Sequence, residues 1–484
     1  MAGIPRIGRK PAFRRLLTIA LGFALSLQVV LVHSVSAASG GAELGRDSVL
    51  AGLLRDALAN RPELAQAQAT VQADQARVPQ ARALPDPVLS LGVQNDGFQG
   101  LQIGTMETSY WSIVGAQTFP WYGKRSLRAK TQSLGAKQSE SDLERARLSV
   151  QAEVERGYVD LLLVRDQIRI LGTLEALWIQ AEGLSRSRYE TGEGAQSDVL
   201  RAQLERTRLQ QQRWALVAEE RRRLAVLNRS VGHPLDQVIP TAVSLGEVAD
   251  PPLPDSLSAT ADAEARSPEL HRALLAVEQS GALVSLARKE YYPDLTVSGG
   301  VMPRGGEFEP MWQAGVSVPL PLWAGSKQSN AVREYRLRGQ AAESSAETIR
   351  RLVRQRLEER RAMLTALLET NRLYRSGLLI QSDATVSSAM AQYTVGKVPF
   401  ASVLEALSGY LTDLVGFYES VAAAQRIDIA QHEVSLDPVS GPALGGIGGA
   451  SMSGSSGMGS APTRAGSAPP AAAAGSTSSA MPKM

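Results

Sequence analysis

Histidine and cysteine are the residue types that most often bind metals or take part in catalysis, and here they form no recognisable site. The 484 residues include four histidines and no cysteine. His33 lies near the N-terminus and His233, His271 and His432 are isolated, so no pair has the spacing of an HExxH helix or of another zinc site. We therefore expect neither an enzyme nor a cofactor nor a bound metal.

Two further patterns have the residue types of a ligand site. Gly325-Ser326-Lys327 lacks the upstream glycine of a phosphate loop, and Gly123-Lys124 repeats it, so we interpret both as strand-to-helix turns. Thioether sulfurs can bind Cu(I), but a low-complexity tail with scattered residues is the simpler interpretation of four methionines, Met452, Met458, Met481 and Met484.

The N-terminal segment has the pattern of a signal peptide. Five basic residues precede an apolar run over residues 16–32, and Val35-Ser36-Ala37 follows as a cleavage site. This predicts export and a signal peptide at residues 1–37. A membrane anchor is the alternative, because a run of 17 apolar residues is at the lower limit of a spanning helix.

The charge balance of the mature chain argues against a nucleic-acid partner. Removing the five basic leader residues reduces the 51 lysines and arginines to 46, against 48 aspartates and glutamates. The mature chain is then slightly acidic, so the electrostatic attraction that drives nucleic-acid binding is missing.

An internal duplication organises the rest of the chain. Landmarks recur at offsets of 201 to 208 residues: Pro-Glu-Leu at 62–64 and 268–270, Pro-Asp at 85–86 and 293–294, the prolines before the long helices at 120 and 321, and Tyr-x-x-Gly at 189–192 and 393–396. We predict a first repeat over residues 48–247 and a second over residues 255–436. Residues 437–484 are rich in Gly, Ser, Ala and Pro, which predicts a disordered tail.

Each repeat is expected to contain one β-hairpin and long helices. Apolar and small polar residues alternate near residues 89–94, 111–119, 295–301 and 312–318, which predicts four strands. Residues 127–189 and 327–393 lack proline, are rich in helix formers and carry only narrow apolar stripes. Such helices pack side by side in a wall. Return helices of about 34 residues should begin at Asp198 and Ser402 as N-caps.

Four strands are too few to close a membrane barrel, which needs about eight. Two or three protomers would supply enough, so the strand count predicts an oligomer without fixing its order. Aromatic side chains in membrane proteins gather at the lipid interface, and four tryptophans lie beside the strands: Trp111, Trp121, Trp312 and Trp323. Ordinary core packing is the alternative role for them.

The duplicated order of helix, hairpin, long helix, tip turn and return helix resembles the outer membrane efflux protein (TolC) family. The resemblance implies an α+β membrane protein, TolC-like, with a long α-helical periplasmic barrel and a transmembrane β-barrel of four strands per protomer, closed by trimerisation. It also implies a passive exit duct in the outer membrane of a Gram-negative bacterium. A periplasmic adaptor would dock on the homotrimer, and an inner-membrane pump of the RND type would feed it.

The motifs leave open which substrate the protein transports and to which class of envelope protein it belongs. The Pro-Trp-Tyr-Gly-Lys stretch at residues 120–124 is similar to the subgroup of this family that serves heavy-metal efflux, whereas drugs or other small molecules are the alternative cargo. An adaptor-like helical-hairpin protein and a structural coiled-coil protein of the envelope are the alternative classes.

The resemblance also assigns site residues. It places the adaptor-docking tip at the two Tyr-x-x-Gly turns, at Tyr189, Gly192, Tyr393, Gly396 and Lys397. Lys397 is included because Val398 occupies the position of the family's tip-locking arginine.

The channel gate falls, by the same resemblance, on Glu405, Ser402, Asp198 and Arg201. Three copies of Glu405 would form an acidic ring that attracts cations. A solvated residue on an exposed helix face is the alternative interpretation of Glu405.

Overall fold

The structure is a computed structural model that describes residues 44, 47–98, 100–241, 243–253 and 255–438. The predicted signal peptide lies outside these residues, and so does the predicted tail beyond residue 438. The chain divides into two units, Met1–Asp437 and Pro438–Met484, and the description below concerns the first.

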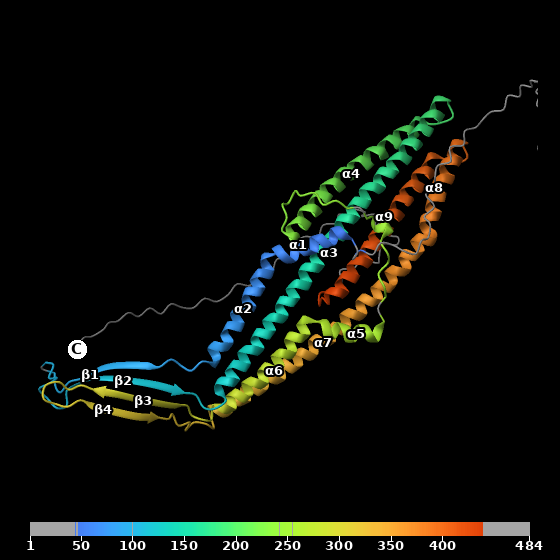
Figure 1. The fold of residues 1–484 in the computed structure, drawn as a ribbon. Helices are drawn as coiled ribbons and strands as arrows, with labels where there is room; N and C mark the ends of the chain where they lie inside the picture. The colour runs from blue at the N-terminus through green and yellow to red at the C-terminus, as the bar shows by residue number, and fades with distance from the viewer. Residues whose placement is uncertain (1–43, 45–46, 99, 242, 254, 439–484) are drawn as a thin grey trace, which may run out of the picture. The chain divides into compact units, whose positions relative to one another are not determined.

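Four antiparallel strands form one sheet in the order β1-β2-β3-β4 (Figure 1). The first hairpin consists of β1 (Val88–Gln94) and β2 (Tyr110–Phe119), and the second of β3 (Leu295–Met302) and β4 (Met311–Ser317). β2 pairs with β3, so the central ladder joins the two repeats. The predicted strand count is confirmed.

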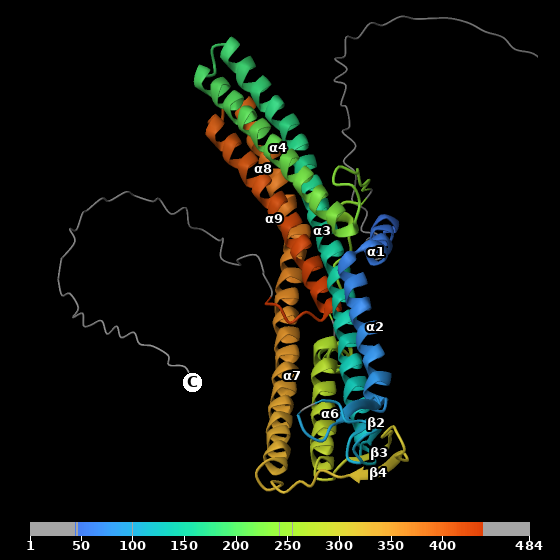
Figure 2. The same ribbon diagram turned by 90° about the vertical axis from the view of Figure 1, so that its left-hand side faces the viewer.

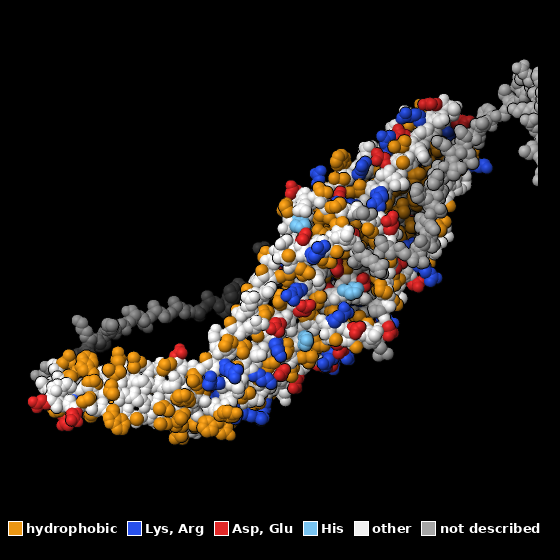
Figure 3. Space-filling model, in the orientation of Figure 1, with side chains coloured by type: hydrophobic (Ala, Val, Ile, Leu, Met, Phe, Trp, Pro, Cys, Tyr) orange, Lys and Arg blue, Asp and Glu red, His pale blue; other side chains and the backbone are white. Residues whose placement is uncertain are grey.

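The sheet exposes apolar side chains on one face. In β3 the exposed Leu295, Val297 and Val301 alternate with half-buried small residues such as Thr296 and Ser298. Figure 3 shows hydrophobic side chains gathered over the sheet, whereas the charged side chains on this face of the molecule lie mostly over the helices. An exposed apolar face of this kind is rare on a surface that stays in water.

The first repeat contains the helices that the sequence predicts. α1 (Ser48–Asn60) and α2 (Pro62–Arg82) precede the hairpin, and α3 (Lys124–Glu190) and α4 (Gln196–Val231) follow it. α3 has 67 residues and therefore runs for about 100 Å at 1.5 Å per residue. Pro62 occupies the first turn of α2, where a missing N–H costs nothing.

The second repeat follows the same plan with one interruption. α5 (Ser256–Arg266) and α6 (Pro268–Lys289) precede the hairpin, and α7 (Gln328–Leu373), α8 (Leu379–Thr394) and α9 (Phe400–Glu433) follow it. A π-helical turn at Tyr374–Leu378 lies between α7 and α8, so the predicted helix over residues 327–393 is present as one continuous helical run with a π-turn inside it. The Tyr374 hydroxyl lies 2.6 Å from where a Cβ would stand on Gly416, which lets it pack against α9.

The return helices start earlier than predicted. α4 and α9 begin at Gln196 and Phe400, and their N-caps are Ala195 and Pro399, which make no side-chain capping bond. Asp198 and Ser402 therefore lie inside the first turn and are not N-caps. The fixed φ of Pro399 suits the extended backbone of an N-cap, although its ring has no acceptor for the free N–H groups of the first turn.

The helices nearest the sheet form a single layer in the order α2, α3, α6, α7, because contacts join each to the next (Figure 2). This order follows the strand order, since each of these helices is connected to the strand of the same rank. At the other end α3 packs between α4 and α9, and α9 packs against α8.

Two buried apolar clusters hold the helices together. The larger one includes Tyr158, Leu161 and Leu227 and joins α1, α3, α4 and α9. The second includes Leu174, Trp178 and Leu407 and joins α3, α4, α8 and α9 near the turns. The core is thus distributed along the wall, as narrow apolar stripes predict.

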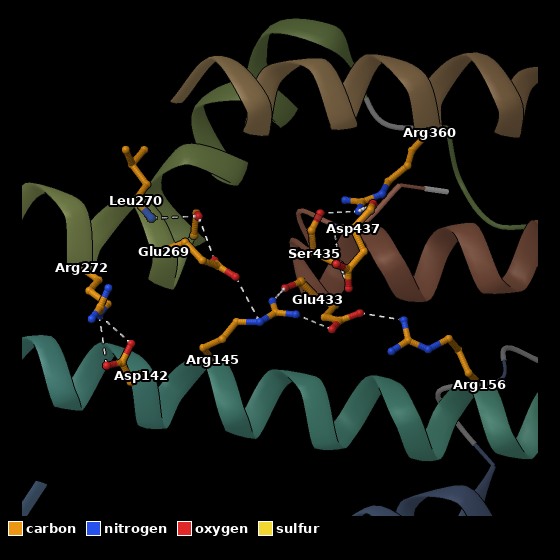
Figure 4. A network of polar contacts seen from close by, with 11 residues as sticks. Asp142, Arg145, Arg156, Glu269, Leu270, Arg272, Arg360, Glu433, Ser435 and Asp437 are labelled. Carbon is orange, nitrogen blue, oxygen red and sulfur yellow. Dashed lines mark hydrogen bonds and ion pairs between the residues drawn. The ribbon is translucent and has the colours of Figure 1, made fainter. Parts of the chain in front are cut away.

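A buried ion-pair network fixes the end of α9 against α3 (Figure 4). The side chain of Glu433 is 2% exposed; its Oε1 lies 2.5 Å from Nη2 of Arg145 and its Oε2 lies 2.7 Å from Nη1 of Arg156. Arg145 also reaches Glu269 of α6 at 3.1 Å, and Arg360 of α7 donates to the Ser435 carbonyl oxygen. These contacts therefore connect α3, α6, α7 and the end of α9 through charged side chains.

Candidate functional site

The two Tyr-x-x-Gly turns adopt the same backbone conformation. Gly192 and Gly396 have φ values of 79° and 72°, in the left-handed region that favours glycine. In each turn the glycine N–H donates to the tyrosine carbonyl oxygen at 3.0 Å. One local rule therefore closes the helical hairpin in both repeats.

The tyrosines of the two motifs lie in different surroundings. Tyr189 is exposed, whereas Tyr393 is buried against Phe400, with ring centroids 5.2 Å apart. The Tyr393 hydroxyl donates to Oδ2 of Asp198 at 3.2 Å. Burial, together with the Asp198 carboxylate, raises the pKa of Tyr393 to about 12. Asp198, predicted as a gate residue, thus ties the first return helix to the second tip.

Arg188 joins the two turns, and no motif in the sequence pointed to it. Its Nη1 donates to the Tyr393 carbonyl oxygen at 2.5 Å and its Nη2 to the Glu193 carbonyl oxygen at 3.2 Å. Its guanidinium carbon also lies 4.9 Å from the centre of the Tyr393 ring, a cation–π distance. The available signal was its place directly before the Tyr-x-x-Gly motif, where the second repeat has Gln392.

Lys397 does not lock the tip within one chain. Its side chain is exposed and forms no hydrogen bond or ion pair with any residue that the structure describes. The arginine that binds the opposite turn comes instead from α3, at residue 188. A docking role for Lys397 remains a prediction.

Ser402 and Glu405 line an open groove of about 740 Å³ between α8 and α9. Asp413 lines the same groove and accepts a hydrogen bond from the Ser382 hydroxyl. Glu405 is exposed and makes no hydrogen bond or ion pair with the described part of the chain. Its carboxylate is therefore free to meet an ion or another protomer.

Arg201 is not brought to Glu405. It is exposed on α4, and among the described residues its side chain has neither a hydrogen bond nor an ion pair. Of the four predicted gate residues, the structure thus gathers only Ser402 and Glu405 in one groove.

The four predicted interface tryptophans stand at two levels of the sheet. Trp111 and Trp312 are the second residues of β2 and β4. Trp121 and Trp323 follow the same two strands, near the helices. Trp121 follows Trp111 by ten residues and Trp323 follows Trp312 by eleven, which is at most about 35 Å of extended chain. All four are exposed, Trp312 and Trp323 by 78% and 75%, so core packing does not describe them. Trp121 stacks on Tyr292 with centroids 5.3 Å apart.

The described residues contain neither a spanning helix nor a metal cluster. None of their helices is both long enough and apolar enough to cross a membrane. Nor do the His, Asp and Glu side chains in that part of the chain form a group of three suited to a metal ion.

A family model described as "Outer membrane efflux protein" matches residues 53–233 and 260–413, which is more than half of the chain. The two matched segments lie within residues 48–247 and 255–436.

Individual proteins are also similar. The "Cobalt-zinc-cadmium resistance protein CzcC" of Cupriavidus metallidurans is 23% identical over 245 residues, which is 50% of this chain and 56% of the relative. The match therefore spans only about half the length of that relative.

Solved structures share the fold. The outer-membrane channel OprN has a TM-score of 0.67 at 18% identity, over 80% of this chain and 90% of its own. CusC has a TM-score of 0.69 at 16% identity, over 80% of this chain and 92% of its own. Its crystal structures are described as bearing on conformational changes that accompany folding and transmembrane channel formation.

Proposed function

Because the chain belongs to the outer membrane efflux protein family, we propose that it is the outer-membrane exit duct of a tripartite efflux system. The duct is passive and conducts what an inner-membrane pump of the RND type and a periplasmic adaptor deliver to it. The observation that carries the proposal is the combination, in one chain, of a sheet with two open edges and a duplicated helical tip.

The assembly in this proposal is a homotrimer. β1 and β4 are the outer strands of the sheet, and unpaired edges in lipid are too costly to persist. Three copies supply twelve strands, enough for a closed barrel whose apolar face meets outer-membrane lipid. The exposed tryptophans at two levels support this orientation, because aromatic side chains favour both lipid interfaces.

The cargo in this proposal is a heavy-metal cation. Support comes from the name of the Cupriavidus metallidurans relative, which is a cobalt, zinc and cadmium resistance protein, and from the Pro-Trp-Tyr-Gly-Lys stretch at residues 120–124. Three copies of Glu405 around the axis would give the duct a preference for cations. Drugs and other small molecules are the competing cargo.

The adaptor docks at the two turns in this proposal, on Tyr189, Gly192, Gly396 and Lys397. Open space around a Cβ built at Gly192 supports this, because no atom of the described chain lies within 4 Å of it. A partner backbone can therefore approach closely there.

Cells that lack their own efflux duct provide the test. They express a periplasmic adaptor and an RND pump of a heavy-metal efflux system, with or without the chain, and are loaded with cobalt, zinc or cadmium. We expect the cellular metal content to fall only when all three proteins are present. If the metal content stays the same and the content of a loaded drug falls instead, the cargo is a drug and not a metal cation. If neither falls, the chain is not an efflux duct.

The same cells separate the alternative classes. An adaptor-like protein would be recovered without detergent and would replace the adaptor instead of the duct. A structural coiled-coil protein is already incompatible with the four-stranded sheet.

A further inference from the structure

The two ends of the sheet differ in charge. The connections between β1 and β2 and between β3 and β4 hold one arginine, Arg304, against the carboxylates of Asp96, Glu107, Glu307 and Glu309. The opposite end, where the strands meet the helices, consists of residues 76–87, 120–130, 283–294 and 318–334. These four segments contain ten basic and four acidic residues, a surplus of six positive charges. Figure 3 shows Lys and Arg side chains gathered where the hydrophobic sheet meets the helices.

Ion pairs within the chain neutralise only some of these basic side chains. Lys124 is buried beside Asp294 and Glu290, at 2.8 and 3.1 Å. Three others have one carboxylate each, and these are Arg77, Arg128 and Lys130. The remaining six have no carboxylate partner in the described part of the chain, and we call them the junction cations: Arg82, Arg125, Arg288, Lys289, Lys327 and Arg333. Their number equals the surplus charge.

Helix polarity explains only half of the junction cations. A helix C-terminus favours basic side chains, which accounts for Arg82 in α2 and for the last two residues of α6. α3 and α7 begin at this end of the sheet, however, and a helix N-terminus favours carboxylates. Neither has an acidic residue in its first turn, where α3 carries Arg125 and Lys327 is the N-cap of α7. Something outside the chain must favour positive charge there.

Exposed aromatic side chains lie at the same level. Trp121 stacks on Tyr292, and Nζ of Lys289 lies 5.5 Å from the centre of the Tyr292 ring. Trp323 is 75% exposed and stands four residues before Lys327. Tryptophan and tyrosine favour the boundary between lipid and water, and the stems of Lys and Arg extend the charge from that boundary toward water.

The depth of the junction cations matches a layer of lipid headgroups. Arg125 is the second residue of α3, and Arg333 lies five residues after the start of α7, so both are within about 8 Å of the helix starts. A headgroup layer is roughly 5–8 Å thick on each side of the hydrocarbon. The apolar face of the sheet therefore ends where the positive charge begins, as the boundary of a lipid leaflet requires.

We propose that the junction cations bind the phosphate groups of anionic phospholipids in the leaflet of the outer membrane that faces the periplasm. The helices extend into the periplasm, so the junction lies at that leaflet, and its positive charge complements the lipid phosphates. The acidic connections at the other end of the sheet repel the same lipids. The contact is independent of the cargo, because it involves the membrane end of the helices and not the conduction of a substrate.

Brominated lipids test the preference, because bromine on an acyl chain quenches nearby tryptophans, and Trp121 and Trp323 lie beside the junction cations. The wild-type oligomer is reconstituted in phosphatidylcholine vesicles that contain a small fraction of brominated phosphatidylglycerol or brominated phosphatidylcholine. We expect several-fold stronger quenching per mole by the anionic lipid, and a smaller difference at high salt. Equal quenching by the two lipids would overturn the proposal.

A triple variant tests the residues. Arg82→Gln, Arg288→Gln and Lys327→Gln together remove three exposed junction cations without leaving a described carboxylate unpaired. Each should reduce the preference for the anionic lipid by up to roughly fivefold. Arg82→Lys, Arg288→Lys and Lys327→Arg together keep the charge and should keep the preference.

A matched control separates the junction from net charge. Arg55→Gln, Arg221→Gln and Arg266→Gln together remove the same charge from exposed positions on α1, α4 and α5, and should leave the preference intact. An equal loss in this control, or no loss in the triple junction variant, would overturn the proposal.

Two further measurements keep the outcome interpretable. The oligomer band on a gel and the helical circular dichroism show whether each variant folds, and the three single junction variants, each expected to lose part of the preference, replace a triple variant that does not assemble. Single variants that all quench like the wild type would then overturn the proposal. Current through the reconstituted protein reports on the duct itself, so a conducting channel without lipid preference contradicts this inference and leaves the proposed function standing.

Discussion

Arg188 and Tyr393 join the two helical tips of one chain: the guanidinium donates to the Tyr393 carbonyl oxygen at 2.5 Å and lies over the ring of the same residue. The bond links α3 of the first repeat to α8 of the second. Any widening of the tip must therefore break it or carry both turns together.

Arg188→Ala should loosen the tip. Loss of a charge-assisted bond at a partly exposed site is worth about 1–2 kcal/mol, or roughly a five- to thirty-fold shift toward an open tip. We expect more frequent or larger openings in single-channel recordings, with an unchanged yield of oligomer. Arg186→Ala is the control, because Arg186 pairs with Glu182 of its own helix. Equal recordings for the two variants would refute the role of Arg188.

Glu405→Ala should weaken cation selectivity and block by divalent ions, because the carboxylate is exposed in the groove between α8 and α9. Reversal potentials in a salt gradient measure the selectivity. Glu343→Ala, which removes an exposed glutamate from α7, should leave both properties intact. If the two variants behave alike, Glu405 is a solvated surface residue.

Gly192→Leu should reduce efflux without reducing the amount of oligomer. A Cβ at this position meets no described atom of the chain within 4 Å, so the bulk of a side chain is directed at a docking partner. Gly192→Asn is the matched control, because asparagine tolerates the left-handed backbone and separates strain from bulk. Gly396 is a less clean probe, since a Cβ there would lie 3.1 Å from Nη2 of Arg188. Normal efflux by Gly192→Leu would show that the adaptor does not dock at this turn.

Glu433→Gln should destabilise the helical wall by about 2–3 kcal/mol, somewhat less than a fully buried pair because both arginines are partly exposed. Thermal unfolding followed by helical circular dichroism measures the loss. Glu144→Gln removes an exposed pair with Arg147 and should cost less than about 1 kcal/mol. Equal losses would show that the network in Figure 4 adds no stability of its own.

Stability should also depend on the protonation of Glu155. Burial raises its pKa, and nearby Asp428 and Glu433 act in the same direction against His432 and Arg156. The folded state thus holds this proton more tightly than the unfolded chain. The contribution to stability is complete below the ordinary pKa of 4.5 and is lost as the pH rises through the raised value.

Glu155→Gln should therefore raise the melting temperature at pH 7 and lose this advantage as the pH falls toward 4. Glu153→Gln is the control, because Glu153 lies two residues away and pairs with Arg61, and this variant should not reproduce the trend. A constant difference across the pH range would contradict the assignment.

Local constraints made much of the fold predictable. A glycine three residues after a tyrosine predicts a left-handed turn, and both turns have it. The alternation of apolar residues likewise predicts strands, because period two is a property of the backbone. The predicted helix starts were wrong by two residues, because Ala195 and Pro399 occupy the N-cap positions although neither has a side-chain acceptor, whereas the prediction relied on capping side chains.

Contacts between distant residues were not predictable. Arg188 meets Tyr393 across 205 residues, and only the packing of α3 beside α8 brings them together. The Tyr374 hydroxyl, in the π-turn at Tyr374–Leu378, lies against Gly416 of α9, and this contact leaves no mark on the helical pattern.

Ion conduction by the purified protein is the most direct test of a passive duct. Oligomer extracted from the outer-membrane fraction is inserted into a planar lipid bilayer, and the current is recorded in symmetric and asymmetric salt. We predict steady single-channel steps that favour cations. A folded oligomer with the expected helical dichroism that carries no current under any condition would contradict the account.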